Sequence, residues 1–157
     1  MMVKIMNREI LFRAKKADGG EWVEGYVVQR YGEWFIYDIN NSDTCRQNNY
    51  LIDEDTICQY TGLTDKNGKK IFDGDVVKDS AGVCGEVKFG LYSAGFSIPD
   101  TNQGFYIEFP EESLYRKELG YWENKVVVIG NIHDKSEQQK DQRSNIIYRD
   151  FMKKGRE

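Results

Sequence analysis

Short runs of apolar residues alternate with polar ones in the N-terminal part of the chain, a pattern typical of β-strands. The runs combine aromatic and β-branched side chains and are separated by turn residues such as Asp18-Gly19-Gly20. Residues 38–50 are rich in Asn, Asp and Ser, which predicts a loop. We therefore expect an N-terminal β-meander over residues 1–60, with strands at residues 9–13, 22–28 and 34–37.

The same alternation continues through residues 61–134, where turn signals are frequent. Asn67-Gly68 predicts a type I′ hairpin turn, because both residue types accept positive φ angles. Thr61-Gly62-Leu63 is expected to end the preceding strand, and residues 111–119 to form a helical turn. Closely spaced short strands are typical of small barrels, so we predict an SH3-like β-barrel over 61–134. A strand at residues 55–60 precedes it, and its own strands are expected to open within residues 71–78 and to follow at 84–89, 95–98, 104–109 and 125–130.

The C-terminal segment, residues 135–157, is predicted to be a polar tail. It begins with a stretch that lacks apolar residues and therefore cannot form a core. Ile147 and Phe151, and likewise Tyr148 and Met152, then follow at helical spacing. Either a short helix at 143–153 or a frayed end is consistent with this pattern.

Composition narrows the classes of function. The formal net charge is −4, and aromatic residues make up 13% of the chain. Non-specific nucleic-acid binders usually carry a basic excess, which this chain lacks over its length. No apolar run approaches a membrane span, and the N-terminus reaches charged residues before a signal-peptide core could form. We expect a cytoplasmic protein without a membrane segment.

Residues able to carry chemistry are few. The three cysteines (Cys45, Cys58 and Cys84) and the single His133 lie far apart in sequence, so we expect reduced thiols rather than a zinc site. Asp65, Asp73 and Asp75 could hold a divalent cation for metal-assisted hydrolysis, but turn chemistry explains the same residues more simply. We predict no catalytic site, no cofactor and no metal.

A longer motif carries a resemblance to a known family. The block from Asp55 to Val77 (DTICQYTGLTDKNGKKIFDGDVV), the Trp-x-x-Gly-Tyr element at Trp22–Tyr26 and the ending Val128–His133 (VIGNIH) together resemble YopX-like proteins, which bacteriophages and prophages encode. These pieces span residues 8 to 134, or most of the chain. The resemblance implies a mostly β protein whose later half is an SH3-like barrel, and it implies no functional residues.

Two hypotheses of function follow. The first is a non-enzymatic module that binds an unknown protein partner and forms homo-oligomers; deletion of 136–157 is then expected to change the oligomeric state. The second is a nucleic-acid-binding protein, because small barrels can stack bases on aromatic rings beside Lys or Arg. The residues for that role are Lys88, Tyr92, Phe96, Phe105 and Tyr106.

Overall fold

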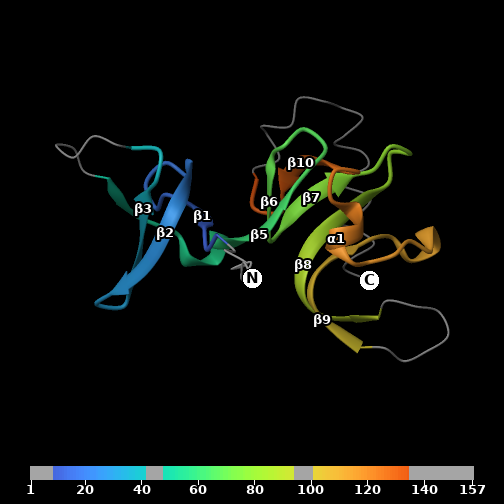
Figure 1. The fold of residues 1–157 in the computed structure, drawn as a ribbon. Helices are drawn as coiled ribbons and strands as arrows, with labels where there is room; N and C mark the ends of the chain where they lie inside the picture. The colour runs from blue at the N-terminus through green and yellow to red at the C-terminus, as the bar shows by residue number, and fades with distance from the viewer. Residues whose placement is uncertain (1–8, 42–47, 94–100, 135–157) are drawn as a thin grey trace, which may run out of the picture. The chain divides into compact units, whose positions relative to one another are not determined.

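A computed structural model describes residues 9–41, 48–93 and 101–134. The chain divides into two compact units, Met1–Gly62 and Leu63–Glu157. The described residues form ten β-strands and three short helical segments (Figure 1). This confirms the mostly β fold class predicted from the sequence.

The first unit contains an antiparallel sheet. Its strands belong to the order β4-β3-β2-β1-β5-β6, in which β5 crosses the division between the units and β6 belongs to the second. An isolated bridge from Lys16 to Ile52 joins the chain that follows β4 back to β1. The elements of this unit are β1 (Phe12–Lys15), β2 (Trp22–Arg30), β3 (Glu33–Asp38), β4 (Asn49–Leu51), the 3-10 helix η1 (Glu54–Thr56) and the start of β5 (Cys58–Thr64).

Alternation along these strands separates a core face from a solvent face. Ala14 lies opposite Val23 in the β1–β2 ladder, and both side chains are buried together with Ile36 and Ile52. At Gly25, also in β2, the backbone of β3 lies so close that a Cβ atom would overlap the backbone carbonyl of Tyr37. The glycine of the Trp-x-x-Gly-Tyr element is therefore required by the backbone of β3.

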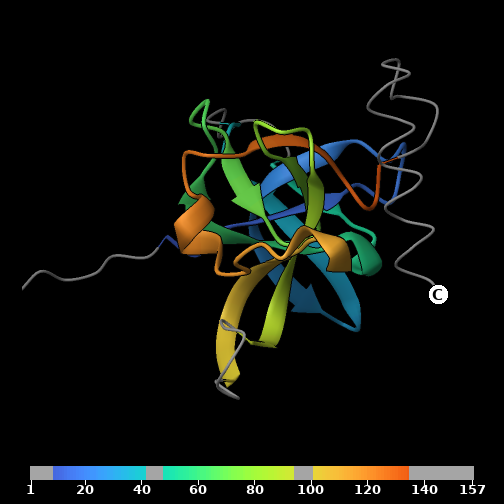
Figure 2. The same ribbon diagram turned by 90° about the vertical axis from the view of Figure 1, so that its right-hand side faces the viewer.

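The second unit contains a four-stranded antiparallel sheet in the order β10-β7-β8-β9. The β8–β9 ladder runs without interruption from the pair Glu86–Glu108 to the pair Ser93–Thr101, so the two strands form a long ribbon (Figure 2). The elements are β6 (Lys70–Phe72), β7 (Asp75–Lys78), β8 (Cys84–Ser93), β9 (Thr101–Glu108), the 3-10 helix η2 (Glu111–Ser113), α1 (Leu119–Trp122) and β10 (Val127–Asn131).

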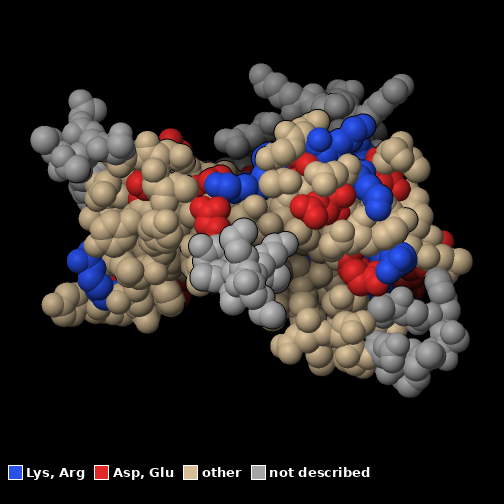
Figure 3. Space-filling view, viewed as in Figure 1, with Lys and Arg blue, Asp and Glu red and all other residues tan. Residues whose placement is uncertain are grey.

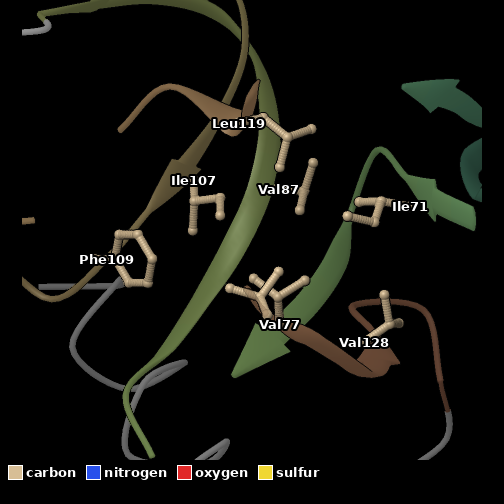
Figure 4. Packing of buried hydrophobic residues seen from close by; sticks show 8 residues of the cluster. Ile71, Val77, Val87, Ile107, Phe109, Leu119 and Val128 are labelled. Carbon is tan, nitrogen blue, oxygen red and sulfur yellow. The ribbon is translucent and has the colours of Figure 1, made fainter. Parts of the chain in front are cut away.

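The core of the second unit is built from almost every one of these elements. Side chains from β6, β7, β8, β9, β10 and α1 converge on one side of the sheet (Figure 4). Each fully buried aliphatic side chain contributes roughly 1.5–3 kcal/mol of transfer free energy. The cluster consists of Ile71, Val77, Val87, Ile107, Phe109, Leu119, Val126 and Val128.

Several predicted boundaries differ from the structure. The expected strand at 9–13 forms at Phe12–Lys15, and the loop expected at 38–50 ends in β4. Thr61-Gly62-Leu63 does not end a strand, because β5 continues to Thr64 with Gly62 at φ 87°. A glycine within a strand commonly accommodates an irregularity without ending the strand. The turn at Asn67-Gly68 is not type I′, since among the described residues there only Gly68 has a positive φ angle.

Of the remaining predictions, one is met in part and others concern residues that the structure does not describe. The helical turn expected at 111–119 is replaced by η2 and the start of α1. The strand expected at 95–98 and the polar tail from residue 135 lie outside the described residues. No helix in the part of the chain that the structure describes is long and apolar enough to cross a membrane. Closure of residues 61–134 into an SH3-like barrel stays a prediction.

Candidate interaction site

The aspartates considered as metal ligands are occupied with backbone hydrogen bonds. Asp65 is buried, and its Oδ1 accepts from the backbone N–H of Asn67 at 2.8 Å and of Lys69 at 2.9 Å. Its Oδ2 accepts from the N–H of Val128 at 3.0 Å. Asp65 therefore closes the β5–β6 turn and attaches it to the start of β10. These three hydrogen bonds explain why its carboxyl group can be buried.

Asp75 has a comparable role at the β6–β7 turn. It is fully buried, and its Oδ2 accepts from the N–H of Phe72 at 2.8 Å. Its Oδ1 accepts from the side-chain amide of Asn131 at 3.0 Å, and the side-chain Oδ1 of Asn131 accepts from the N–H of His133 at 3.0 Å. The Asp-Gly-Asp and Gly-Asn-Ile-His pieces of the sequence motif are thus joined by one buried network.

The remaining candidate ligands do not assemble either. Asp73 is half-buried, and this burial raises the pKa of its carboxyl group despite the nearby His133. Cys58 and Cys84 are buried thiols that form no disulfide with each other, and Cys45 lies outside the described residues. Within the described ranges, no three His, Cys, Asp or Glu side chains come together as metal ligands would.

The β8–β9 ribbon presents an exposed apolar face. Val87 and Ile107 lie opposite each other and are fully buried in the core. Side chains two residues apart share a face of a strand, so Phe89 and Leu91 continue that face beyond the core. Phe89 is 56% exposed and Leu91 is 68% exposed. We call Phe89, Leu91 and Phe105 the ribbon face; Phe105 lies opposite Phe89, with the two ring centres 5.0 Å apart.

The other side of the ribbon carries three of the residues predicted to contact nucleic acid. Lys88 lies opposite Tyr106 in the ladder, and the rings of Tyr106 and Tyr92 stack with their centres 5.3 Å apart. Phe105 belongs to the opposite face, and Phe96 lies outside the described residues.

Carboxyl groups surround this tyrosine pair. Glu86 and Glu108 form the next residue pair on this side of the ribbon, and the backbone of Glu118 forms an isolated β-bridge with that of Tyr106. Burial raises the pKa of the Tyr106 hydroxyl, and the charges of Glu108 and Glu86 raise it further. Burial likewise raises the pKa of Tyr92, with a further contribution from Glu118. Charges of both signs thus lie near Lys88, since Glu108 lies 3.9 Å from Lys117 and Glu118 is paired with Arg116.

A cleft of about 320 Å³ lies beside the end of β9 and η2. Its wall includes Leu114, which is 69% exposed and adopts a left-handed conformation with φ 53°. A bulky residue at positive φ is uncommon and stores backbone strain. The lining residues are Ser93, Glu108, Phe109, Pro110, Glu111, Ser113, Leu114, Tyr115, Arg116 and Lys117.

Two polar side chains of the cleft wall interact with neighbouring groups. Arg116 forms an ion pair with Glu118 at 2.9 Å, and the Ser113 hydroxyl donates to the carbonyl of Pro110 at 2.7 Å. The Ser113 oxygen is thus tied to the turn in which it lies. The cleft combines side chains of both charge signs with an exposed leucine.

Sequence reasoning missed the two most exposed side chains of the ribbon face. The strand predicted at residues 84–89 ended at Phe89, so Leu91 was not assigned to the same strand face. The continued alternation Val87-Lys88-Phe89-Gly90-Leu91-Tyr92 was the signal that could have found them.

Comparison with known proteins identifies one family. The sequence model of the family described as YopX protein matches residues 11–139. No curated protein matches this chain.

Proposed function

Because the chain belongs to the YopX family, whose description names no reaction, we propose a function from the structure itself: a non-enzymatic module that binds a protein partner through the ribbon face. The observation that carries the proposal is the exposure of Phe89 and Leu91 next to a complete core. We further propose that it acts in the cytoplasm of a bacterium that carries it on a phage or prophage.

The energetics support a polypeptide partner. Phe89 and Leu91 leave apolar surface in water, and covering the exposed part of each side chain recovers a share of the roughly 1.5–3 kcal/mol that full burial gives. Contiguous exposed apolar residues on a folded unit are typical of interaction sites. The adjacent cleft, with Leu114 exposed and Arg116 and Glu118 paired beside it, adds the polar rim that such sites usually have.

The test is affinity capture from a lysate of the bacterium that encodes the protein. Leu91→Ser removes apolar surface from the ribbon face, and Gln29→Ser changes an exposed residue of β2 as a matched control. The proposal predicts a protein that wild type and Gln29→Ser retain and Leu91→Ser loses. Identical capture by all three proteins would place the binding surface elsewhere.

A second candidate is binding of single-stranded nucleic acid to the Tyr92–Tyr106 pair. It is favoured by the stacked rings and by Lys88 on the same side of the ribbon. Glu86 and Glu108 oppose it, and on the face shown in Figure 3 the blue and red residues of the second unit are interspersed.

Fluorescence anisotropy with labelled DNA and RNA decides between the two candidates. Nucleic-acid binding would appear as an affinity that falls steeply with salt and is lost in Tyr92→Ala. The protein-binding proposal predicts no binding even at low salt, where electrostatic attraction is strongest.

A further inference from the structure

Strand β9 lies at one edge of the four-stranded sheet of the second unit. The outer side of an edge strand presents N–H and C=O groups that can pair with another strand. Folded proteins commonly cover such an edge, or place charged residues or proline on it, so that it does not pair with other chains. Whether each edge of this sheet is covered, or carries charged residues or proline, therefore indicates whether another strand can pair with it.

The other edge and the inner half of β9 are covered. At the β10 edge, the N–H of Val128 donates to Asp65 at 3.0 Å, and the carbonyl of Val126 accepts from Lys66 at 2.9 Å. On β9, the N–H of Ile107 donates to the carbonyl of Lys117 at 2.8 Å. The turns on either side of the core thus supply partners for these backbone groups.

The outer half of β9 has no such cover among the described residues. The N–H of Ile107 points away from β8, and backbone direction repeats every second residue along a strand. Because the β8–β9 register is uninterrupted, the backbone groups of Gln103 and Thr101 also point away from β8. Both residues are exposed, and no described residue outside the sheet bonds to their backbone groups.

Nothing in the side chains of this stretch discourages pairing. Residues 101–107 read Thr-Asn-Gln-Gly-Phe-Tyr-Ile, without a charge or a proline. We propose that this edge pairs in antiparallel fashion with the same edge of a second copy of the chain, around a two-fold axis near Gln103. The covered Ile107 limits the pairing to the residues that precede it.

A second copy suits the edge because the pairing is self-complementary. A two-fold axis places Gln103 beside its symmetry mate, where each amide can both donate and accept a hydrogen bond. An uncharged edge meets its own copy without repulsion, although each chain carries a net charge of −4. The pairing uses backbone groups of β9, whereas the function proposed above uses side chains of the ribbon face; the Gln103 side chain lies beside that face, opposite Leu91 in the ladder.

Analytical ultracentrifugation of the full chain with charge-swapped variants tests this interface. Wild type is expected at about twice the single-chain mass of 18.3 kDa. Gln103→Lys and Gln103→Glu should each sediment as single chains, because like charges directly opposite each other in a ladder are destabilising. An equimolar mixture of the two variants should restore the dimer, and Gln29→Lys should remain dimeric.

Either of two results overturns the proposal: a single-chain mass for wild type, or a dimer that persists in both Gln103 variants. Circular dichroism and the melting temperature establish that each variant is folded, and Thr101→Lys replaces Gln103→Lys should the latter fail to fold. Loss of partner capture in Leu91→Ser with an unchanged mass would concern the proposed function alone.

Discussion

At the scale of single residues, buried polar side chains of the second unit hold turns together. Asp65 and Asp75 accept hydrogen bonds from backbone N–H groups, and Asn131 links Asp75 to the end of β10. A buried donor that loses its acceptor costs the free energy of its desolvation. These residues should therefore matter for stability.

Substitution of Asp75 by Ala is expected to lower the free energy of unfolding by about 3 kcal/mol, because it leaves the N–H of Phe72 and the amide of Asn131 buried without this acceptor. Urea denaturation measures the change. Asp18→Ala, at an exposed turn of the first unit, is the control and should change stability by about 0.5 kcal/mol or less. A similar small effect for Asp75→Ala would contradict the structural role.

The half-buried carboxyl group of Glu86 gives a prediction about how the stability of the fold depends on pH. Burial raises the pKa of its carboxyl group, and the charges of Asp73 and Glu108 add to the effect, whereas Lys88 opposes it. A raised pKa in the folded state means that the ionised carboxylate opposes folding at neutral pH. This penalty disappears as the pH falls through the raised pKa to below the ordinary glutamate pKa of about 4.3.

Glu86→Gln should therefore melt at a higher temperature than wild type at pH 7, and the difference should close as the pH approaches 4. Thermal denaturation followed by circular dichroism across this range measures it. Glu33→Gln, on the exposed end of β3, is the control for the change in net charge. A difference that grows as the pH falls would mean that the Glu86 carboxylate is stabilised in the fold.

At the scale of elements, alternation of apolar and polar residues predicted the strands well and their ends poorly. Trp22–Arg30 and Glu33–Asp38 formed close to the expected positions, because aromatic and β-branched runs there are bounded by clear turn residues. The limits of β5 and β8 were missed at Gly62 and Gly90, since a glycine within a strand resembles a turn in the sequence. Only pairing with a neighbouring strand distinguishes the two cases.

The close approach of β2 and β3 gives a prediction at this scale. Gly25→Ala places a methyl group against the backbone carbonyl of Tyr37, so the two strands must separate. We expect a loss of about 3 kcal/mol or more, or failure to fold, measured by urea denaturation. Gly104→Ala in β9 meets no atom within 4 Å and should leave stability nearly unchanged. Equal effects of the two substitutions would contradict this packing.

At the scale of the whole molecule, the sequence predicted the fold class and the family but not the site. The motif from Asp55 to Val77 is conspicuous because it builds buried turns, as the bonds of Asp65 and Asp75 show. The residues proposed to bind a partner, Phe89 and Leu91, resemble core residues in the sequence. Their exposure depends on where the core ends, which local patterns do not determine.

The central claim, that the ribbon face contacts a protein partner, is tested most directly by site-specific photo-crosslinking in the living bacterium. A photoreactive side chain is placed at Leu91 and, as a control, at Tyr31, which is fully exposed in the first unit. The account predicts an adduct between the Leu91 position and a polypeptide other than this chain, and no such adduct from Tyr31. Adducts from both positions alike, or from neither, would contradict it.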